Sequence, residues 1–122
     1  MLHHVNTIFH FFSTAVLSIS ISPPSALVFQ GSNQQIACTV QGTPAAQTIS
    51  WTRNGVSIAI DNSKYTGGNT ANPSLTINNF QSSDAGSYVC STTNAAGTLA
   101  SGVSSLTYGG KYDLVLYKYR FN

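Results

Sequence analysis

Charged side chains are scarce in this chain of 122 residues: only 7% of the residues are charged, and glutamate is absent. Between positions 16 and 107 the charges cancel, because they are limited to Arg53, Lys64, Asp61 and Asp84. The formal net charge of +2 therefore arises after position 110. A region without a basic stripe cannot neutralise a row of phosphates, so nucleic-acid binding is not expected.

Histidine is absent after position 10, which removes the commonest general base from the rest of the chain. A nucleophilic serine would have no histidine to activate it. Paired carboxylates would have to be Asp61 and Asp84, which lie in different predicted elements. Cysteine is limited to Cys38 and Cys90, which have no Cys-x-x-Cys partner and no nearby histidine. We therefore expect no enzyme activity, no catalytic residue, no metal and no cofactor.

Long apolar runs are also missing, since no stretch of about 18 apolar residues occurs, and a membrane span is not expected. Residues 1–15 are a candidate signal peptide, because the apolar stretch 8–12 precedes three small residues at 13–15. The alternative is an irregular N-terminal segment, because His10 interrupts the stretch and no Lys or Arg precedes it. At the other end, residues 109–122 form a tail of mixed basic and aromatic residues that either adds a strand or stays disordered.

Apolar residues recur at every second position between 18 and 107, in short runs separated by turn residues, and no segment has a helical period. Asn54-Gly55 is the strongest hairpin signal, because both residues accept a positive φ. Seven or eight such strands predict an all-β sandwich or barrel. A bulge is expected near Gly102. The strands are predicted at 19–21 with a continuation at 26–30, and then at 36–40, 49–53, 56–60, 64–65, 75–77, 88–93 and 98–107.

Three marks in the sequence occur together. Trp51 follows Cys38 by thirteen positions, and Cys90 follows Trp51 by thirty-nine. The pattern Asp84-x-Gly86-x-Tyr88-x-Cys90 completes the set. With these marks the chain resembles the immunoglobulin superfamily, in particular its I-set-like domains, over about residues 18 to 107. The resemblance implies an immunoglobulin-like sandwich of two antiparallel sheets with Greek-key connections, spanning residues 16–108.

The resemblance also implies roles for the marked residues in the core. Cys38 and Cys90 would form a disulfide between the sheets, and Trp51 would pack on it. Closing a loop of about 53 residues should stabilise the fold by roughly 4 kcal/mol in the chain-entropy model. A disulfide in turn implies an oxidising compartment.

Four further residues acquire structural roles by the same resemblance. The Tyr88 hydroxyl would bond to the backbone near the polar corner at 81–86, and Gly86 would allow a tight turn there. Asp84 would pair with Lys64 as an exposed ion pair, which is worth only about 0–1 kcal/mol.

The function implied is that of a non-enzymatic recognition or adhesion module, secreted or part of a cell-surface ectodomain, and belonging to a larger receptor or adhesion protein. Its partner would be another protein or a second copy. The alternative is a structural spacer in a modular extracellular or muscle-type array. Parity predicts a neutral candidate interaction face on the sheet of Trp51 and Cys90, consisting of Thr52, Val89, Ser91, Thr93 and Leu99, with the loops 42–47 and 94–97 as the other option. No Asn-x-Ser/Thr site occurs, so no N-glycan is expected to cover it.

Overall fold

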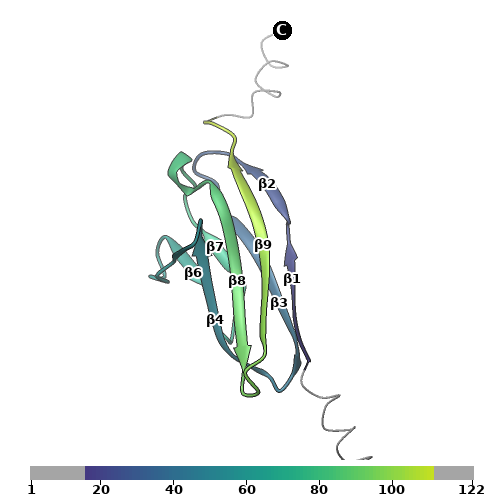
Figure 1. Ribbon diagram of the computed structural model, residues 1–122. Helices are drawn as coiled ribbons and strands as arrows, with labels where there is room; N and C mark the ends of the chain where they lie inside the picture. The colour runs from purple at the N-terminus through teal and green to yellow at the C-terminus, as the bar shows by residue number, and fades with distance from the viewer. Residues whose placement is uncertain (1–15, 112–122) are drawn as a thin grey trace, which may run out of the picture.

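The computed structural model describes residues 16–111, which form two β-sheets packed face to face (Figure 1). The candidate signal peptide at 1–15 and all but the first three residues of the expected tail lie outside the described residues. The predicted sandwich of two sheets is confirmed. Within the described residues its first strand begins at Val16 and its last strand ends at Tyr108.

One sheet has four strands and the other has five. The four-stranded sheet has the order β1 (Val16–Ser22), β3 (Gln34–Thr43), β7 (Leu75–Ile77) and β6 (Tyr65–Gly67). The five-stranded sheet has the order β2 (Ser25–Val28), β9 (Leu99–Tyr108), β8 (Gly86–Asn94), β4 (Ala46–Arg53) and β5 (Val56–Ser57). A 3-10 turn, η1 (Ser82–Asp84), precedes β8.

Strict alternation of side chains explains why these segments form strands with one buried face. In β8, Tyr88, Cys90 and Thr92 are buried, and their neighbours are partly exposed. In β3, Ile36 and Cys38 are buried in the same way. The core between the sheets contains Val28, Ile36, Cys38, Trp51, Leu75, Ile77, Phe80, Tyr88, Cys90 and Leu106.

One strand pairing differs from the expected antiparallel arrangement: β2 pairs with β9 in parallel. After the kink at Pro23-Pro24 the chain leaves the sheet of β1 and joins the opposite sheet. Two hydrogen bonds attach the kink to β9: the Ser104 Oγ donates to the Pro23 carbonyl at 2.7 Å, and the Ser105 N–H donates to the Pro24 carbonyl at 2.9 Å.

Two local predictions were wrong. The return strand expected at 56–60 ends at Ser57, because Ile58 and Ile60 turn inward and pack against the core. No bulge occurs at Gly102, since β8 and β9 pair in continuous register. The register shift lies instead in β4, between Ala46 and Thr48.

Candidate functional site

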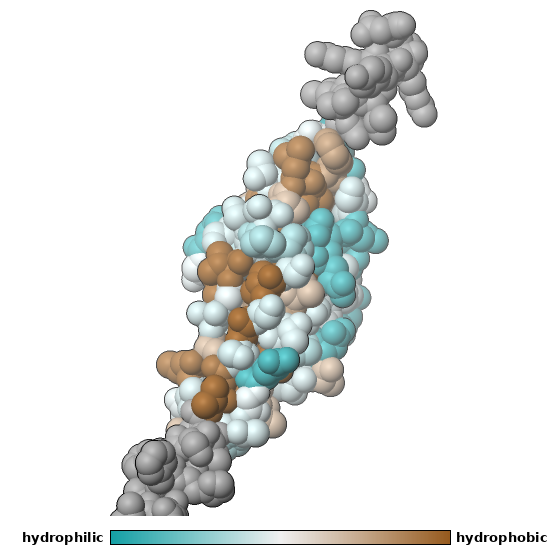
Figure 2. Space-filling model, turned by 90° about the vertical axis from the view of Figure 1, so that its right-hand side faces the viewer, coloured by the Kyte–Doolittle hydropathy of each residue, from teal (hydrophilic) through white to brown (hydrophobic). Residues whose placement is uncertain are grey.

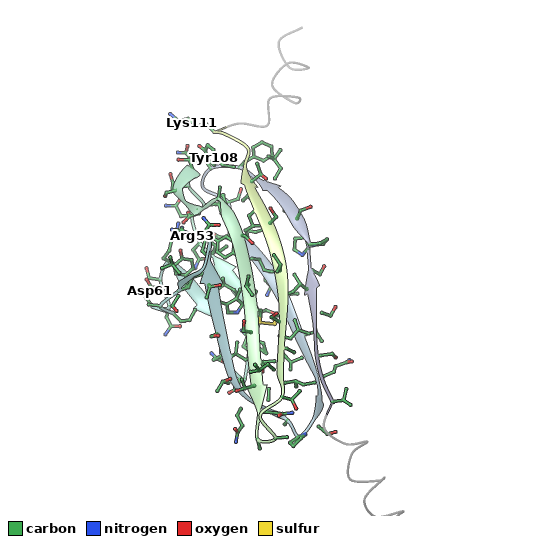
Figure 3. All side chains as sticks on the ribbon, viewed as in Figure 1. Arg53, Asp61, Tyr108 and Lys111 are labelled. Carbon is green, nitrogen blue, oxygen red and sulfur yellow. A yellow bond between two sulfur atoms is a disulfide. The ribbon has the colours of Figure 1, made fainter. Side chains whose placement is uncertain are left out.

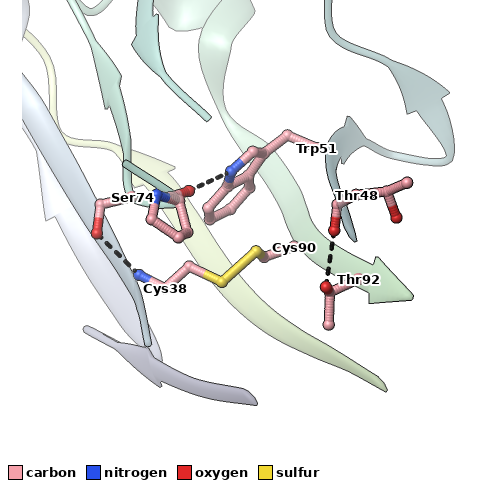
Figure 4. The surroundings of a disulfide bond; sticks show 7 residues. Cys38, Thr48, Trp51, Ser74, Cys90 and Thr92 are labelled. Carbon is pink, nitrogen blue, oxygen red and sulfur yellow. Dashed lines mark hydrogen bonds between the residues drawn. A yellow bond between two sulfur atoms is a disulfide. The ribbon is translucent and has the colours of Figure 1, made fainter. Parts of the chain in front are cut away.

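The centre of the domain is the Cys38–Cys90 disulfide, which joins β3 to β8 and confirms the bridge inferred from the resemblance (Figure 4). Trp51 lies directly opposite Cys90 on the neighbouring strand and is only 2% exposed. Its indole N–H donates to the Pro73 carbonyl at 2.8 Å, so the one polar atom of the ring has a partner. Because the disulfide and the Trp51 ring are buried in the core, they hold the sheets together and do not form a binding surface.

The polar corner beside η1 contains three of the four charges of residues 16–107. Asp84 accepts a hydrogen bond from the Lys64 Nζ at 2.6 Å and another from the Gln81 N–H at 2.8 Å, and its Oδ1 lies 3.7 Å from the Arg53 Nη1. The expected exposed pair is therefore partly buried: the Asp84 side chain is 5% exposed and that of Lys64 is 32% exposed. Tyr88 donates its hydroxyl hydrogen to the Asp84 carbonyl. Burial raises the pKa of Tyr88 to about 12.

The fourth charge, Asp61, has a local structural role. Its Oδ1 accepts the N–H groups of Tyr65 at 3.0 Å and Ser63 at 2.9 Å. These hydrogen bonds favour the carboxylate and lower the pKa of Asp61. Arg53 and Asp61 both lie on the side of the molecule that carries β4 and β6 (Figure 3). The charges of the sandwich are thus occupied in fixing loops.

The outward face of the five-stranded sheet is uncharged. The register aligns its side chains in rows across β4, β8 and β9: Thr52 opposite Val89, and Thr93 opposite Leu99. The structure thus brings all five residues of the candidate interaction face to one surface, here called the outer face. The outer face also contains Thr48, Ser50, Ser101 and Val103. A shallow hollow of about 450 Å³ lies at the end of this face where β9 begins, and it is lined by Thr48, Ser50, Ser91, Thr93, Leu99 and Ser101 among others.

Two side chains protrude from this surface. Leu99 is 75% exposed and Val103 is 53% exposed, and both lie on β9. Of the large apolar residues exposed in 16–111, only Val56 lies away from β1, β2 and β9. Figure 2 shows apolar side chains following the long axis of the molecule on the side that carries these three strands.

The loops 42–47 and 94–97, which were the other candidate surface, are short and held in place by hydrogen bonds. β3 extends to Thr43 and β4 begins at Ala46, which leaves two residues between them. Asn94 is buried, and its side chain joins the two loops by donating to the Pro44 carbonyl at 3.2 Å and accepting the Thr98 N–H at 3.0 Å. Because both loops are short and held by Asn94, the outer face is the larger candidate surface.

Comparison with known proteins now identifies the family. A family model described as the immunoglobulin domain matches residues 18–94. The chain belongs to the immunoglobulin domain family. It is 36% identical over 81 residues to a titin homolog of Caenorhabditis elegans and 35% identical over 82 residues to human hemicentin-1, with 66% of this chain covered in each case. It spans only about 0% and 1% of the lengths of these relatives.

Solved structures agree with this assignment. The four N-terminal immunoglobulin domains of Dscam1 isoform 1.9 match with a TM-score of 0.65 and 30% identity, covering 79% of this chain and 22% of that one. The eight N-terminal domains of the Down Syndrome Cell Adhesion Molecule, isoform 1.30.30, match with a TM-score of 0.65 and 28% identity, covering 80% and 13%.

Sequence reasoning missed part of the outer face of this immunoglobulin domain. Val103 lies opposite Val89 and widens the apolar part of the surface. Its parity with Leu99, four positions earlier, is a signal that could have found it. Within the described residues, no helix is long and apolar enough to cross a membrane, and no three His, Cys, Asp or Glu side chains gather in a group that could hold a metal.

Proposed function

We propose that this immunoglobulin domain is a non-enzymatic extracellular recognition or adhesion module that binds protein through the outer face. The observation that carries the proposal is the distribution of charge. Arg53, Lys64 and Asp84 are engaged at one corner, whereas the broad face of the five-stranded sheet has no ionised side chain. The centres of protein interfaces are depleted of charged residues in the same way.

The shape of the outer face supports a protein ligand. Leu99 and Val103 protrude beside a shallow hollow lined mainly by hydroxyl groups. An apolar side chain of a partner can enter such a hollow, and the serine and threonine hydroxyls at its border can exchange water for hydrogen bonds to the partner. An ionic ligand would find no counter-charge there.

An extracellular location is supported by the redox state of the chain. Both cysteines are engaged in the Cys38–Cys90 bond, and such bonds persist mainly in oxidising compartments. One of the solved structures that the chain resembles is that of a cell adhesion molecule.

A second function is favoured by a different observation. The chain matches about 1% or less of the titin homolog and of hemicentin-1, so its relatives include single domains of very long proteins. A spacer in such an array would contribute its length and stability and would need no binding face.

The two functions predict different results in one binding assay. Beads coated with the full chain are mixed with cells of the native source, and binding is compared with beads that carry Val89→Asp. The control, Thr39→Asp, introduces the same charge on the exposed side of β3, in the opposite sheet. We expect Val89→Asp to reduce binding and Thr39→Asp to leave it unchanged. Equal effects of both variants, or no binding by the parent chain, would favour the spacer.

The location is tested by mass spectrometry of the protein exported by its native cells. Alkylation before reduction should label neither Cys38 nor Cys90, because both are in the disulfide. Free thiols in the exported protein would contradict the extracellular assignment.

A further inference from the structure

The strand β9 has an open edge along its first half. β8 pairs with β9 from Leu99 to Leu106, but on the other side β2 pairs only with residues 105–108. Among residues 16–111, no strand pairs with this second edge of β9 between 99 and 104. Main-chain groups at this edge are therefore available to another strand.

Alternation in the antiparallel ladder identifies these main-chain groups. The Asn94 N–H donates to the Thr98 carbonyl, which makes this a hydrogen-bonded pair. Since such pairs alternate, Ala100 and Gly102 bond to β8, and the N–H and carbonyl groups of residues 99, 101 and 103 point to the open edge. Ser105 belongs to the same set: its N–H points away from β8 and donates to the Pro24 carbonyl.

The edge lacks the features that usually prevent strand addition. β9 contains no proline and no ionised residue, and it is ten residues long. The other edge strands are less suitable. β5 has two residues, β6 has three and β2 has four, and the solvent-facing side chains of β1 after Val16 are all serines, which offer no apolar surface to a partner strand.

Packing from below holds the open edge in place. A Cβ atom on Gly102 would lie 2.4 Å from the Ile21 Cγ1 and 2.9 Å from the Ile19 Cγ2, so β1 packs directly beneath β9. The strand is therefore supported by the core and does not need to be ordered when a partner strand binds, which lowers the entropic cost of association.

We propose that the partner at this edge is a second copy of this chain, paired antiparallel through β9 about a two-fold axis at Ser101. In this register Leu99 of each copy lies opposite Val103 of the other, so the two protruding apolar residues cover each other. At the axis, the main-chain N–H and carbonyl groups of Ser101 in one copy bond to those of Ser101 in the other copy. The absence of charge on β9 means that two copies meet without repulsion. The inference goes beyond the proposed function, because it adds self-association at the edge of β9 to the recognition of protein through the outer face.

A cross-linking experiment on the full chain tests the register. In a hydrogen-bonded antiparallel pair the two Cα atoms lie about 5.5 Å apart, which is within the range of a disulfide. Ser101→Cys should therefore give a covalent dimer under mild oxidation, seen without reductant on a denaturing gel. The matched control is Ser91→Cys, which lies beside Ser101 on the same face but one strand further in. We expect no cross-link from Ser91→Cys. Cross-linking of both variants to the same extent would overturn the proposed register.

Sedimentation equilibrium of the full chain tests the edge itself. Ser101→Pro removes an N–H that points to the open edge and leaves the ladder with β8 intact. It should weaken the dimer about tenfold or more, because each copy loses one bond at the axis and the ring intrudes. Val89→Asp, one strand away from the edge, should retain the dimer. Far-ultraviolet circular dichroism verifies that both variants are folded.

Two results would overturn the inference and are distinguishable from failure of the proposed function. Loss of the dimer in Val89→Asp, with retention in Ser101→Pro, would mean that the outer faces and not the edges pair. A parent chain that is monomeric at every concentration would exclude a second copy as the partner, whether the edge is vacant or covered by the chain's own terminal residues. In both cases the binding of coated beads to cells would still test recognition through the outer face.

Discussion

Replacing Trp51 by alanine removes the largest side chain at the centre of the sandwich. The ring is 2% exposed, lies opposite Cys90 and donates its N–H to the Pro73 carbonyl. The variant loses the buried apolar area and the hydrogen bond, and it leaves a cavity against the disulfide. Truncations of this kind cost about 3–5 kcal/mol. That loss is comparable with the whole stability of a small domain, which is about 5–15 kcal/mol.

The effect is measured as the free energy of unfolding in urea. Far-ultraviolet circular dichroism is the suitable signal, because Trp51 is the only tryptophan and its replacement removes the tryptophan fluorescence. Trp51→Phe provides a graded variant: it keeps most of the ring but leaves the Pro73 carbonyl without its donor, at a cost of about 1–3 kcal/mol. Val56→Ala is the control, since Val56 is 70% exposed, and it should change stability by less than about 0.5 kcal/mol. A loss below about 1 kcal/mol in Trp51→Ala would refute the assignment of Trp51 to the core.

Three further predictions concern Tyr88, Asp84 and Gly102. Burial raises the pKa of Tyr88 to about 12, so the unfolded state loses the phenolic proton at a lower pH than the folded state. This group should therefore reduce the free energy of unfolding between about pH 10 and pH 12, by up to about 1.4 kcal/mol per pH unit. Urea unfolding across this range should show a shallower fall of that free energy with pH for Tyr88→Phe, and an unchanged slope would contradict the burial. Asp84→Asn should lower the urea midpoint by an amount equivalent to about 1–3 kcal/mol, because Lys64 loses its carboxylate partner, and a neutral result would mean that the corner adds no stability. Gly102→Ala should cost about 1–3 kcal/mol in the same assay, because the added methyl group collides with Ile21, whereas a stabilised variant would disprove the close contact between β1 and β9.

Much of the fold could be predicted because its strongest signals are local or depend on fixed spacing. Alternation identifies the buried face of β8, and the resemblance carried by the spacing of Cys38, Trp51 and Cys90 implies a bridge across two sheets. The outer face follows from the same alternation, since residues on either side of Cys90 must point away from the core.

What sequence alone could not provide depends on contacts between distant segments. The prolines after β1 indicate a break in the strand. The change of sheet, however, is decided by the hydrogen bonds from Ser104 and Ser105, which lie about eighty positions later in the chain, to the carbonyl groups of these prolines. Gly102 in a strand suggests a bulge as readily as close packing, and only the approach of Ile21 decides for close packing. The open edge of β9 likewise depends on where β2 ends.

Mapping the contact surface by nuclear magnetic resonance tests the central claim most directly. Amide spectra of the nitrogen-15-labelled full chain are recorded over a series of increasing concentrations and then with solubilised membrane protein from the native cells. The account predicts that signals of residues 89–93 and 99–103 shift or broaden, whereas those of β3 and β7 remain unchanged. Changes confined to the four-stranded sheet, or to the corner of Lys64 and Asp84, would contradict recognition through the uncharged outer face.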